Sequence, residues 1–226
     1  MLNYFKRDKI EIIITNTMEI YNSAISKFLP TPSRSHYVFN LRDFARVVQG
    51  VLLLKPEVVP EGNEGGHKII RLWVHEVYRV FYDRLINESD RELFFQMVKS
   101  CVETNCKEKY SNLFSHLVKE KGDQVTDDDL RSLIFGDYLS KTKDEKLYDE
   151  IMDLKELTET IERSLEDYNY EMSKAPMDLV MFRFAIEHIS RISRVLKQPN
   201  GHCLLVDATK SATVESTNGD DTIEHV

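Results

Sequence analysis

Apolar residues recur every three or four positions along most of this sequence, and only a helix gathers residues at that spacing on one face. The first such stripe comprises Ile10, Ile14, Met18, Tyr21, Ile25 and Phe28. The helix that buries this stripe should end before Pro30, because a residue that precedes proline disfavours helical backbone. An extended connector follows.

Three further stripes predict helices in the first half of the chain. Asn40 is a suitable N-cap for the next helix, because its side-chain oxygen accepts a hydrogen bond from the first turn. The predicted buried face of that helix is Leu41, Phe44, Val47, Val48, Val51 and Leu52. The third helix contains the only tryptophan of the chain and should bury Ile69, Ile70, Trp73, Val77, Val80, Phe81 and Leu85. A short fourth helix should bury Leu93, Phe94, Met97, Val98 and Cys101.

The second half of the chain is less regular. Between residues 103 and 146 charge rises and periodicity weakens, which indicates peripheral short helices and loops. A heptad-like stripe then predicts one long helix that packs on the domain, through Leu147, Ile151, Leu154, Thr158, Ile161, Leu165 and Tyr168. Pro176 suits the first position of a last helix. Its stripe is Leu179, Phe182, Ile186, Ile189, Ile192 and Leu196.

Composition agrees with a mainly α, soluble protein. The 226 residues are 42% hydrophobic and 30% charged, with only 8 Gly and 6 Pro. A net charge of −8 argues against nucleic acid or an anionic membrane as the main partner. The apolar run near the N-terminus is too short for a signal sequence or a membrane span. Three cysteines without a C-x-x-C motif favour reduced thiols, and hence a cytoplasmic protein.

Motifs that resemble catalytic or metal sites are weak. The sequence "HEVYR" at His75 to Arg79 lacks the second histidine of a zinc-protease motif, so His75 and Glu76 are expected to pair with neighbouring helices at the edge of the buried face. Cys101 lies on an apolar stripe and is expected in the core. The glycine-rich "PEGNEGGH" follows no strand and is predicted to be a surface loop. We therefore expect neither a catalytic residue nor a metal site.

Arg42 is the one candidate for ligand binding. It lies in the first turn of the capped helix, where a guanidinium could reach a bound phosphate. A surface ion pair with Asp43 or a glutamate is the simpler interpretation of the residues alone.

The segment from Cys203 to Val206 has the pattern of a first strand in a nucleotide-binding domain. A phosphate-binding loop after such a strand needs glycines, but the chain continues Asp207-Ala208-Thr209-Lys210 without one. The acidic, polar segment 207–226 is predicted to be disordered. A strand without neighbours should favour self-association of the chain.

Four long strings resemble the heavy chain of axonemal dynein: "SRSHYVFNLRDFARVVQGVLL", "RLWVHEVYRVFYDRL", "LIFGDYL" and "APMDLVMFRFAIEHISRISRVLKQPNGHCLLV". The form "KQPNGH" is more similar to inner-arm chains. This resemblance implies a helical lid of the third AAA+ module over residues 1–140. It further implies lead-in helices and the first strand of the fourth module over residues 141–206.

The resemblance also implies a function for the parent protein, an ATP-driven microtubule motor of the ciliary axoneme. Arg42 matches the sensor-2 arginine, which in an intact ring points at the γ-phosphate. ATP or ADP with Mg²⁺, the other AAA+ modules, intermediate and light chains, and microtubules would be partners of the whole motor. This chain is expected to be a non-catalytic lid and connector. The alternative is an independent helical module that binds other proteins, and an ATP-binding enzyme is disfavoured by the missing glycine loop.

Overall fold

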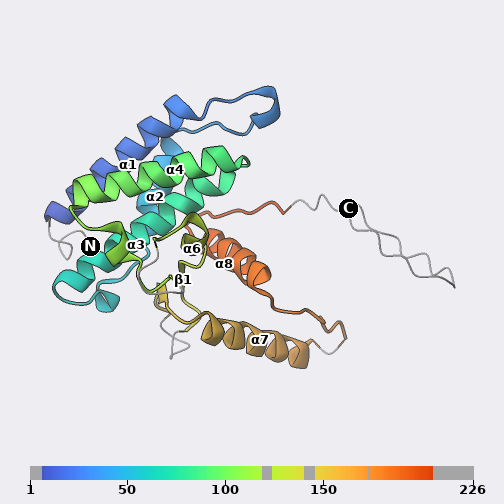
Figure 1. Ribbon diagram of the computed structural model, residues 1–226. Helices are drawn as coiled ribbons and strands as arrows, with labels where there is room; N and C mark the ends of the chain where they lie inside the picture. The colour runs from blue at the N-terminus through green and yellow to red at the C-terminus, as the bar shows by residue number, and fades with distance from the viewer. Residues whose placement is uncertain (1–6, 119–123, 140–145, 173, 206–226) are drawn as a thin grey trace.

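Helices dominate the part of the chain that the structure describes, a computed structural model in which residues 7–118, 124–139, 146–172 and 174–205 are placed (Figure 1). The α-helices are α1 (Arg7–Lys27), α2 (Leu41–Val51), α3 (Asn63–Val80), α4 (Glu88–Cys101), α5 (Tyr110–Leu113), α6 (Asp127–Leu130), α7 (Leu154–Glu171) and α8 (Arg183–Lys197). The short 3-10 helices are η1 (Pro32–Arg34), η2 (Pro56–Val58) and η3 (Tyr82–Arg84), and η4 (Val102–Cys106) is π-helical. The predicted mainly α class is confirmed.

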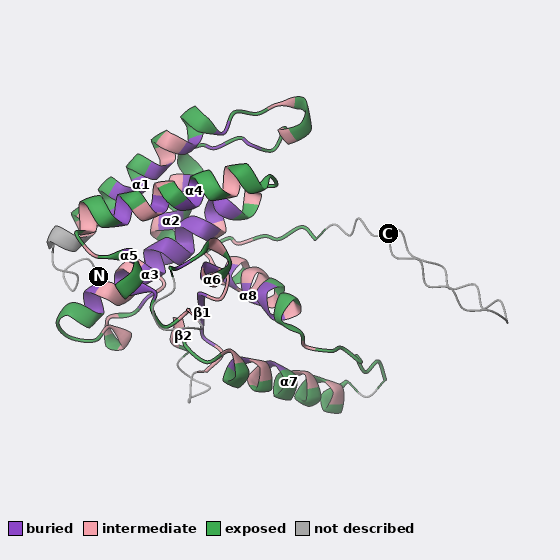
Figure 2. Cartoon of the chain, viewed as in Figure 1, coloured by how far each residue is buried: buried purple, intermediate pink, exposed green. Residues whose placement is uncertain are grey.

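Helix α3 is the centre of the fold, and Figure 2 shows it buried along most of its length. Trp73 has no exposed surface, and its indole Nε1 donates a hydrogen bond to Thr17 Oγ1 of α1 at 2.9 Å. The predicted face of α3 is confirmed, since its members are buried except for the half-buried Ile70. The helix begins at Asn63, so the second half of the predicted glycine-rich loop is its first turn.

The predicted face of α1 was wrong. Ile14, Met18 and Ile25 are 45%, 41% and 39% exposed. Phe28, directly after the helix, is buried as predicted, but the buried positions within α1 are Ile13, Asn16, Thr17, Ile20 and Ala24. The face of α1 that meets the core includes two polar residues. Thr17 accepts the hydrogen bond of the Trp73 indole, and Asn16 contacts Cys106 and Asn105. Counting only apolar residues selected the neighbouring face.

The predicted faces of α2 and α4 are confirmed apart from their ends. Val47 and Val51 are buried in α2, whereas Leu41 and Leu52 are exposed. In α4, Leu93 alone of the predicted residues is exposed.

The region after α4 is less peripheral than predicted. Its apolar islands contribute Leu113, Phe114, Leu130, Leu133 and Phe135 to the main core. The region also holds a strand that periodicity did not reveal, β1 (Ile134–Gly136), which pairs antiparallel with β2 (Asp149–Ile151). In this register Ile134 lies opposite Ile151 and Phe135 opposite Glu150.

The predicted heptad helix is shorter than expected. Ile151 belongs to β2, and α7 begins at Leu154 because the Asp153 side chain caps it, accepting hydrogen bonds from the backbone N–H groups of Lys155 and Glu156. Only Leu157 and Ile161 are buried in α7. They form a second, smaller cluster with Ile134, Ile151 and Ile186. The predicted domain boundary at residue 140 falls between the two paired strands, and remains a prediction.

The start predicted for the last helix was also wrong. Pro176 is not at its first position, because the chain stays extended to Phe182 and α8 begins at Arg183. The buried residues of α8 are Ile186, Glu187, Ser190 and Arg194. Leu179, Phe182 and Leu196 are each more than half exposed. Ile186 is buried as predicted and Ile189 is partly buried beside it. The other three buried residues are polar, and the apolar pattern could not predict them.

The described end of the chain shows no strand. Cys203, Leu204 and Leu205 are exposed and pair with no described strand, while Val206 and the segment 207–226, predicted to be disordered, lie outside the described residues. Within the placed residues, no helix is long and apolar enough to cross a membrane.

Burial of the only tryptophan makes one prediction directly measurable. Trp73 should emit at short wavelength, because its indole lies among apolar side chains and away from water. Urea should shift the emission to longer wavelength together with the loss of helical circular dichroism. A folded, helical sample that emits like indole in water would contradict this packing.

Candidate functional site

The predicted ligand-binding residue, Arg42, lies in the first turn of α2. Asn40 caps this helix as predicted, and its Oδ1 accepts a hydrogen bond from the Arg42 backbone N–H at 2.8 Å. The predicted pair between Arg42 and Asp43 is not formed, because the buried Asp43 carboxylate pairs with Arg84 and, at 3.5 Å, with Arg46. Arg42 is exposed and forms no ion pair with any carboxylate in the described segments. Its guanidinium therefore remains available to a ligand or partner.

A second polar site lies between α3 and α8, where sequence analysis expected only edge contacts. Glu76 of α3 has no exposed surface, and Arg194 of α8 binds its carboxylate through Nε at 2.8 Å and through Nη2. Tyr148, just before β2, donates its hydroxyl to Glu76 Oε1 at 3.3 Å. His75 Nδ1 lies 3.2 Å from the same oxygen. We call these four residues the Glu76 site.

Helix α2 leaves room for this carboxylate through a glycine. A Cβ added at Gly50 would lie 1.7 Å from Glu76 Oε2, closer than any two unbonded atoms approach. The close contact between α2 and Glu76 therefore requires glycine at position 50, although glycine destabilises the interior of a helix. The Glu76 site thus depends on α2, α3 and α8 together.

The electrostatics of the Glu76 site keep an ion pair charged inside the protein. Burial alone would raise the pKa of Glu76, but Arg194 and His75 outweigh it and lower that pKa to about 2. Burial would lower the pKa of Arg194, and Glu76 reverses this effect and raises it. Burial lowers the pKa of His75. At neutral pH the site therefore holds a carboxylate, a guanidinium and a neutral imidazole.

Further ion pairs lie near the Glu76 site and connect α3 and α8 to other segments. The buried Arg71 of α3 bonds Glu150 of β2 through Nε, 2.9 Å from each carboxylate oxygen, and Glu64 through Nη2 at 2.7 Å. The buried Glu187 of α8 accepts a hydrogen bond from Arg131, which follows α6, at 3.3 Å. These contacts attach α3 to β2 and α8 to the segment after α6.

The Glu76 site could be found only in part from the sequence. The prediction of a pair with a neighbouring helix is confirmed for Glu76, which binds Arg194 of α8, whereas His75 pairs with Glu76 of its own helix. Both residues are buried rather than at the edge. A charged residue beside Trp73 and Val77 on an apolar stripe signals that a buried partner exists. It does not identify Arg194, which is 118 residues away.

Two other motifs singled out in the sequence can be located in the structure. Arg79 occupies the second ligand position of "HEVYR", and no cluster of three potential metal ligands occurs within the described ranges. Cys101 is buried as predicted, and burial raises the pKa of its thiol to about 12. Such a thiol remains protonated at neutral pH and is a poor nucleophile.

The Glu76 site predicts that acid destabilises the chain. His75 and Glu76 both have folded-state pKa values below their ordinary values of 6.5 and 4.5, so the unfolded chain binds protons first. Stability should be fully present near neutral pH, begin to fall below about pH 6.5, and fall further between about pH 4.5 and 2. Urea unfolding across this range measures the effect. His75→Gln should flatten the upper part of the profile and the exposed His188→Gln should not, whereas a profile flat down to pH 4 would contradict the assignment.

Comparison with known proteins gives these sites a context. A family model described as an AAA+ lid domain matches residues 13–117, which include most of α1 and all of α2 to α5. A second model, described as the P-loop containing dynein motor region D4, matches residues 177–213, which include α8. The Glu76 site therefore joins the two matched regions.

Individual relatives agree with the family models. The chain is 56% identical over 196 residues to dynein axonemal heavy chain 3 of Homo sapiens, covering 87% of this chain and 5% of that protein. It is 53% identical over 211 residues to the Mus musculus protein of the same name, covering 92% of this chain and 5% of that one. With dynein axonemal heavy chain 12 of Homo sapiens it shares 47% identity over 196 residues, 86% of this chain and 6% of that protein. The chain thus spans about one-twentieth of the length of these relatives, and it belongs to the axonemal dynein heavy-chain family as a segment that contains an AAA+ lid domain.

Proposed function

We propose that this chain is the lid of the third AAA+ module, followed by the lead-in of the fourth, in an inner-arm axonemal dynein heavy chain. The order of the two family matches carries the proposal, because a lid that precedes the D4 region belongs to the module before it. The Glu76 site supports it, since a buried ion pair joins the lid helix α3 to α8 in the D4 match. Movement of the lid would then carry α8 with it.

We propose that the chain itself is not a catalyst. Its contribution is mechanical and positional, because the strand-like residues up to Val206 are followed by Asp207 and not by a glycine-rich phosphate loop. ATP or ADP with Mg²⁺ would bind the intact motor. Arg42 is the one residue of this chain that we assign to that nucleotide, as the sensor-2 arginine that reaches a γ-phosphate held by another domain. Its exposed position without an ion pair fits this role.

The partners and location follow from the same proposal. The other AAA+ modules would contact the lid and α8 within the ring. Intermediate chains, light chains and microtubules would interact through the rest of the heavy chain. The site of action would be the axoneme of cilia.

Substitution of Arg42 tests the role in nucleotide response. In a full-length heavy chain that contains this segment, Arg42→Ala should lower ATP turnover at the third module by on the order of tenfold or more, since a cation at the transferring phosphate is lost. The exposed Arg163→Ala on α7 is the matched control and should leave turnover unchanged. Unchanged turnover in Arg42→Ala would refute the sensor-2 assignment.

Equilibrium binding of labelled ATP to the 226-residue chain tests the non-catalytic proposal. We expect no micromolar binding, because no glycine-rich phosphate loop follows the strand-like segment that ends at Val206. Micromolar affinity would contradict the proposal.

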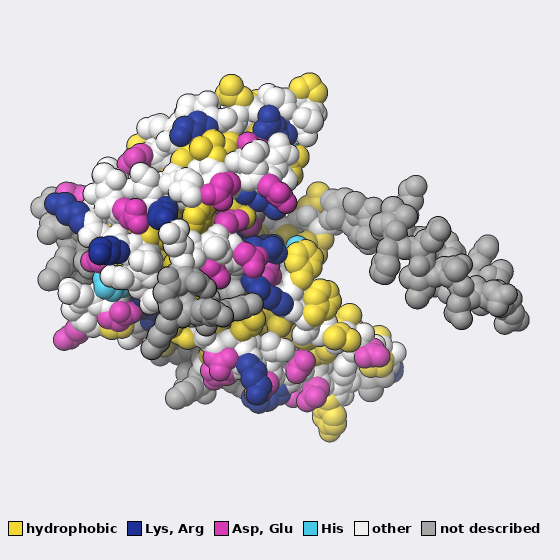
Figure 3. Space-filling model, in the orientation of Figure 1, with side chains coloured by type: hydrophobic (Ala, Val, Ile, Leu, Met, Phe, Trp, Pro, Cys, Tyr) yellow, Lys and Arg dark blue, Asp and Glu magenta, His cyan; other side chains and the backbone are white. Residues whose placement is uncertain are grey.

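One observation favours a second candidate, an independent module that binds proteins. Hydrophobic side chains gather where α8 and the segment before it lie (Figure 3). Among them Val180 is 80% exposed, Phe182 58% and Phe184 51%. Such a surface is typical of a protein interface. Sedimentation of the chain distinguishes the two candidates. An independent module should form a dimer or a stoichiometric complex. Nonspecific aggregation that is abolished by the double substitution Phe182→Ser and Phe184→Ser would favour the lid.

A further inference from the structure

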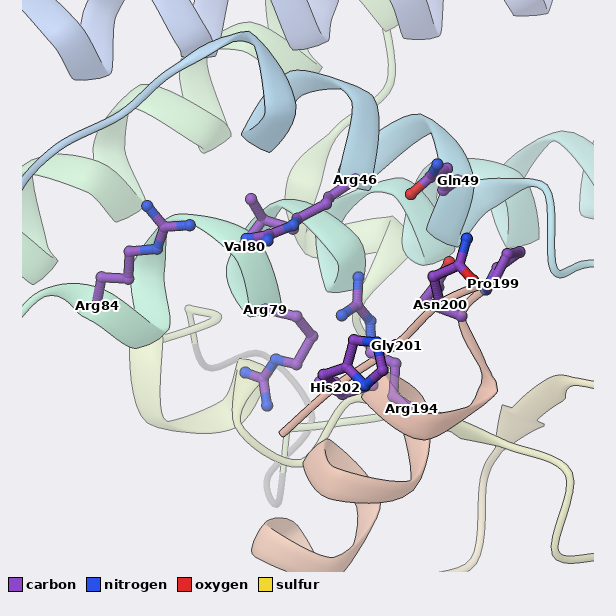
Figure 4. Close-up of a pocket in the computed structure, with 12 residues that line it drawn as sticks. Arg46, Gln49, Arg79, Val80, Arg84, Arg194, Pro199, Asn200, Gly201 and His202 are labelled. Atoms are coloured by element: carbon purple, nitrogen blue, oxygen red, sulfur yellow. The ribbon is translucent and has the colours of Figure 1, made fainter. Parts of the chain in front are cut away.

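A basic pocket lies at the junction of α2, α3 and the end of α8. Its volume is about 320 Å³, and the polar side chains around it include Arg46, Arg79, Arg84, Arg194, Gln198 and His202. Figure 4 labels the arginines and His202, which come from α2, from α3 and the turn after it, and from α8 and the segment that follows. No carboxylate belongs to the described lining, and Arg42 is not part of it. The pocket is therefore distinct from the proposed sensor-2 position.

The carboxylates behind this pocket do not balance its arginines. Arg46 and Arg84 share Asp43. Arg79 binds Asp83 at 3.2 Å, and Asp83 also faces Arg191 at 3.5 Å. Arg191 lies outside the pocket lining and pairs with Glu187 as well, at 3.7 Å. With Glu76 engaged by Arg194, three carboxylates serve the four arginines that line the pocket. This excess of positive charge occurs in a chain of net charge −8.

Several buried polar atoms at the pocket lack a partner. Arg79 Nε, Gln198 Nε2 and Gln198 Oε1 are inaccessible to solvent, and no described residue hydrogen-bonds to them. Burial, together with the charges of Arg191 and Arg194, lowers the pKa of Arg79, which shows that its surroundings disfavour its charge. Unsatisfied buried donors and acceptors are uncommon in folded proteins and indicate a missing interaction.

The unpartnered atoms specify the chemistry of the missing ligand. Two unpartnered donors and a surplus of guanidiniums favour an oxyanion over a neutral or cationic ligand. The acceptor Gln198 Oε1 requires in addition a donor on that ligand, which the hydroxyl of a phosphate at neutral pH supplies and sulfate does not. The volume is at the lower limit for an organic ligand, and no Phe, Tyr or Trp is part of the described lining.

We propose that this pocket is an oxyanion site that binds a phosphate group, with Arg46 and Arg79 donating to its oxygens and Gln198 bonding its hydroxyl. Because Arg79 Nε and the Gln198 amide are buried, both side chains turn toward the pocket when the phosphate binds. A phosphate bound there would contact α2, α3 and α8 at once. It would therefore stabilise the contact between α3 and α8 that the Glu76 site also stabilises. This role does not depend on the nucleotide role proposed for Arg42.

Thermal unfolding of the full 226-residue chain tests this site with inorganic phosphate as the probe. Phosphate at roughly ten times its dissociation constant should raise the Tm by about 3 °C over sodium chloride of matched ionic strength. Sulfate should stabilise less. An equal Tm in phosphate and chloride would overturn the site, and equal stabilisation by sulfate would overturn the assignment to phosphate.

Two variants locate the effect. Arg46→Gln changes a side chain that is 60% exposed and should weaken phosphate binding on the order of tenfold, the loss expected for one charged hydrogen bond. Gln198→Leu should leave the Tm without phosphate unchanged or higher, and it should also weaken phosphate binding on the order of tenfold. This second variant tests the site even if Arg46→Gln does not fold. Arg163→Gln on α7 is the control. Phosphate affinity that is unaltered in the variant tested would overturn the proposal.

The source of the phosphate group is distinguished by a parallel titration with ATP at the same millimolar concentrations. A gain in Tm that depends on Arg46 and equals that of phosphate would identify a nucleotide phosphate. A gain confined to inorganic phosphate would identify the free ion. Both results support an oxyanion site, and absence of a gain with either ligand would overturn it.

Discussion

Replacement of Glu76 with alanine should destabilise the chain by about 3 to 5 kcal/mol, the loss expected when one partner of a buried ion pair is removed. Arg194 would remain buried as an uncompensated cation, and Tyr148 would lose the acceptor of its hydroxyl. Urea unfolding, followed by circular dichroism, measures the change. The effect should be larger than that of most single substitutions, because the charge cannot be neutralised by deprotonation of arginine.

Two further variants separate the ion pair from simple loss of packing. Glu166→Ala removes an exposed glutamate from α7 and should change the free energy of unfolding by less than about 0.5 kcal/mol. Glu76→Leu combined with Arg194→Met removes both charges and should be milder than Glu76→Ala, because apolar pairs replace buried ion pairs at little cost. If Glu76→Ala costs no more than Glu166→Ala, the buried pair does not hold the structure together.

Replacement of Phe94 with alanine should cost about 3 to 5 kcal/mol, the range for a large aromatic residue lost from a close-packed core. Phe94 has no exposed surface. Its ring centroid lies 6.2 Å from that of Phe28, directly after α1, and 5.9 Å from that of Tyr78 on α3. The substitution therefore loosens α4 from both α1 and α3.

Phe182→Ala is the matched control for Phe94→Ala. Phe182 is 58% exposed, so its truncation should change the free energy of unfolding by less than about 0.5 kcal/mol. The comparison uses the same chemical change at a buried and an exposed position. Similar losses in both variants would contradict the core assigned to α1, α3 and α4.

The sequence predicts this fold best where apolar residues alone decide which side of a helix is buried. That condition holds for α3, whose predicted face around Trp73 and Val77 is buried. It fails for α1, where Thr17 faces the core to accept the Trp73 N–H, and for α8, where Arg194 faces it to meet Glu76. Polar residues with buried partners are invisible to a count of apolar spacing.

Short elements that depend on contacts with distant residues could not be predicted from the sequence either. Strand β2 has three residues, too few to show a period, and it interrupts the predicted heptad helix because Ile151 packs opposite Ile134. Helix α7 begins only after the Asp153 cap. The pairing partner is known only once the chain has folded, so sequence spacing favoured the longer helix.

The candidate sites divide in the same way. Arg42 could be located because it depends on a local signal, the Asn40 cap of α2. The Glu76 site could be located only in part, because its members come from α3, α8 and the segment before β2. The basic pocket likewise combines Arg46 with Gln198, and no local pattern connects them.

The central claim is that the lid and α8 form one mechanical unit through the Glu76 site. Amide hydrogen exchange of the intact chain, measured for α3 and α8 in the natural sequence and in Glu76→Gln, tests it most directly. We predict that α8 is protected nearly as strongly as α3 in the natural sequence, and that Glu76→Gln accelerates exchange in α8 far more than in α3. Rapid exchange of α8 in the natural sequence, unchanged by the substitution, would contradict the claim.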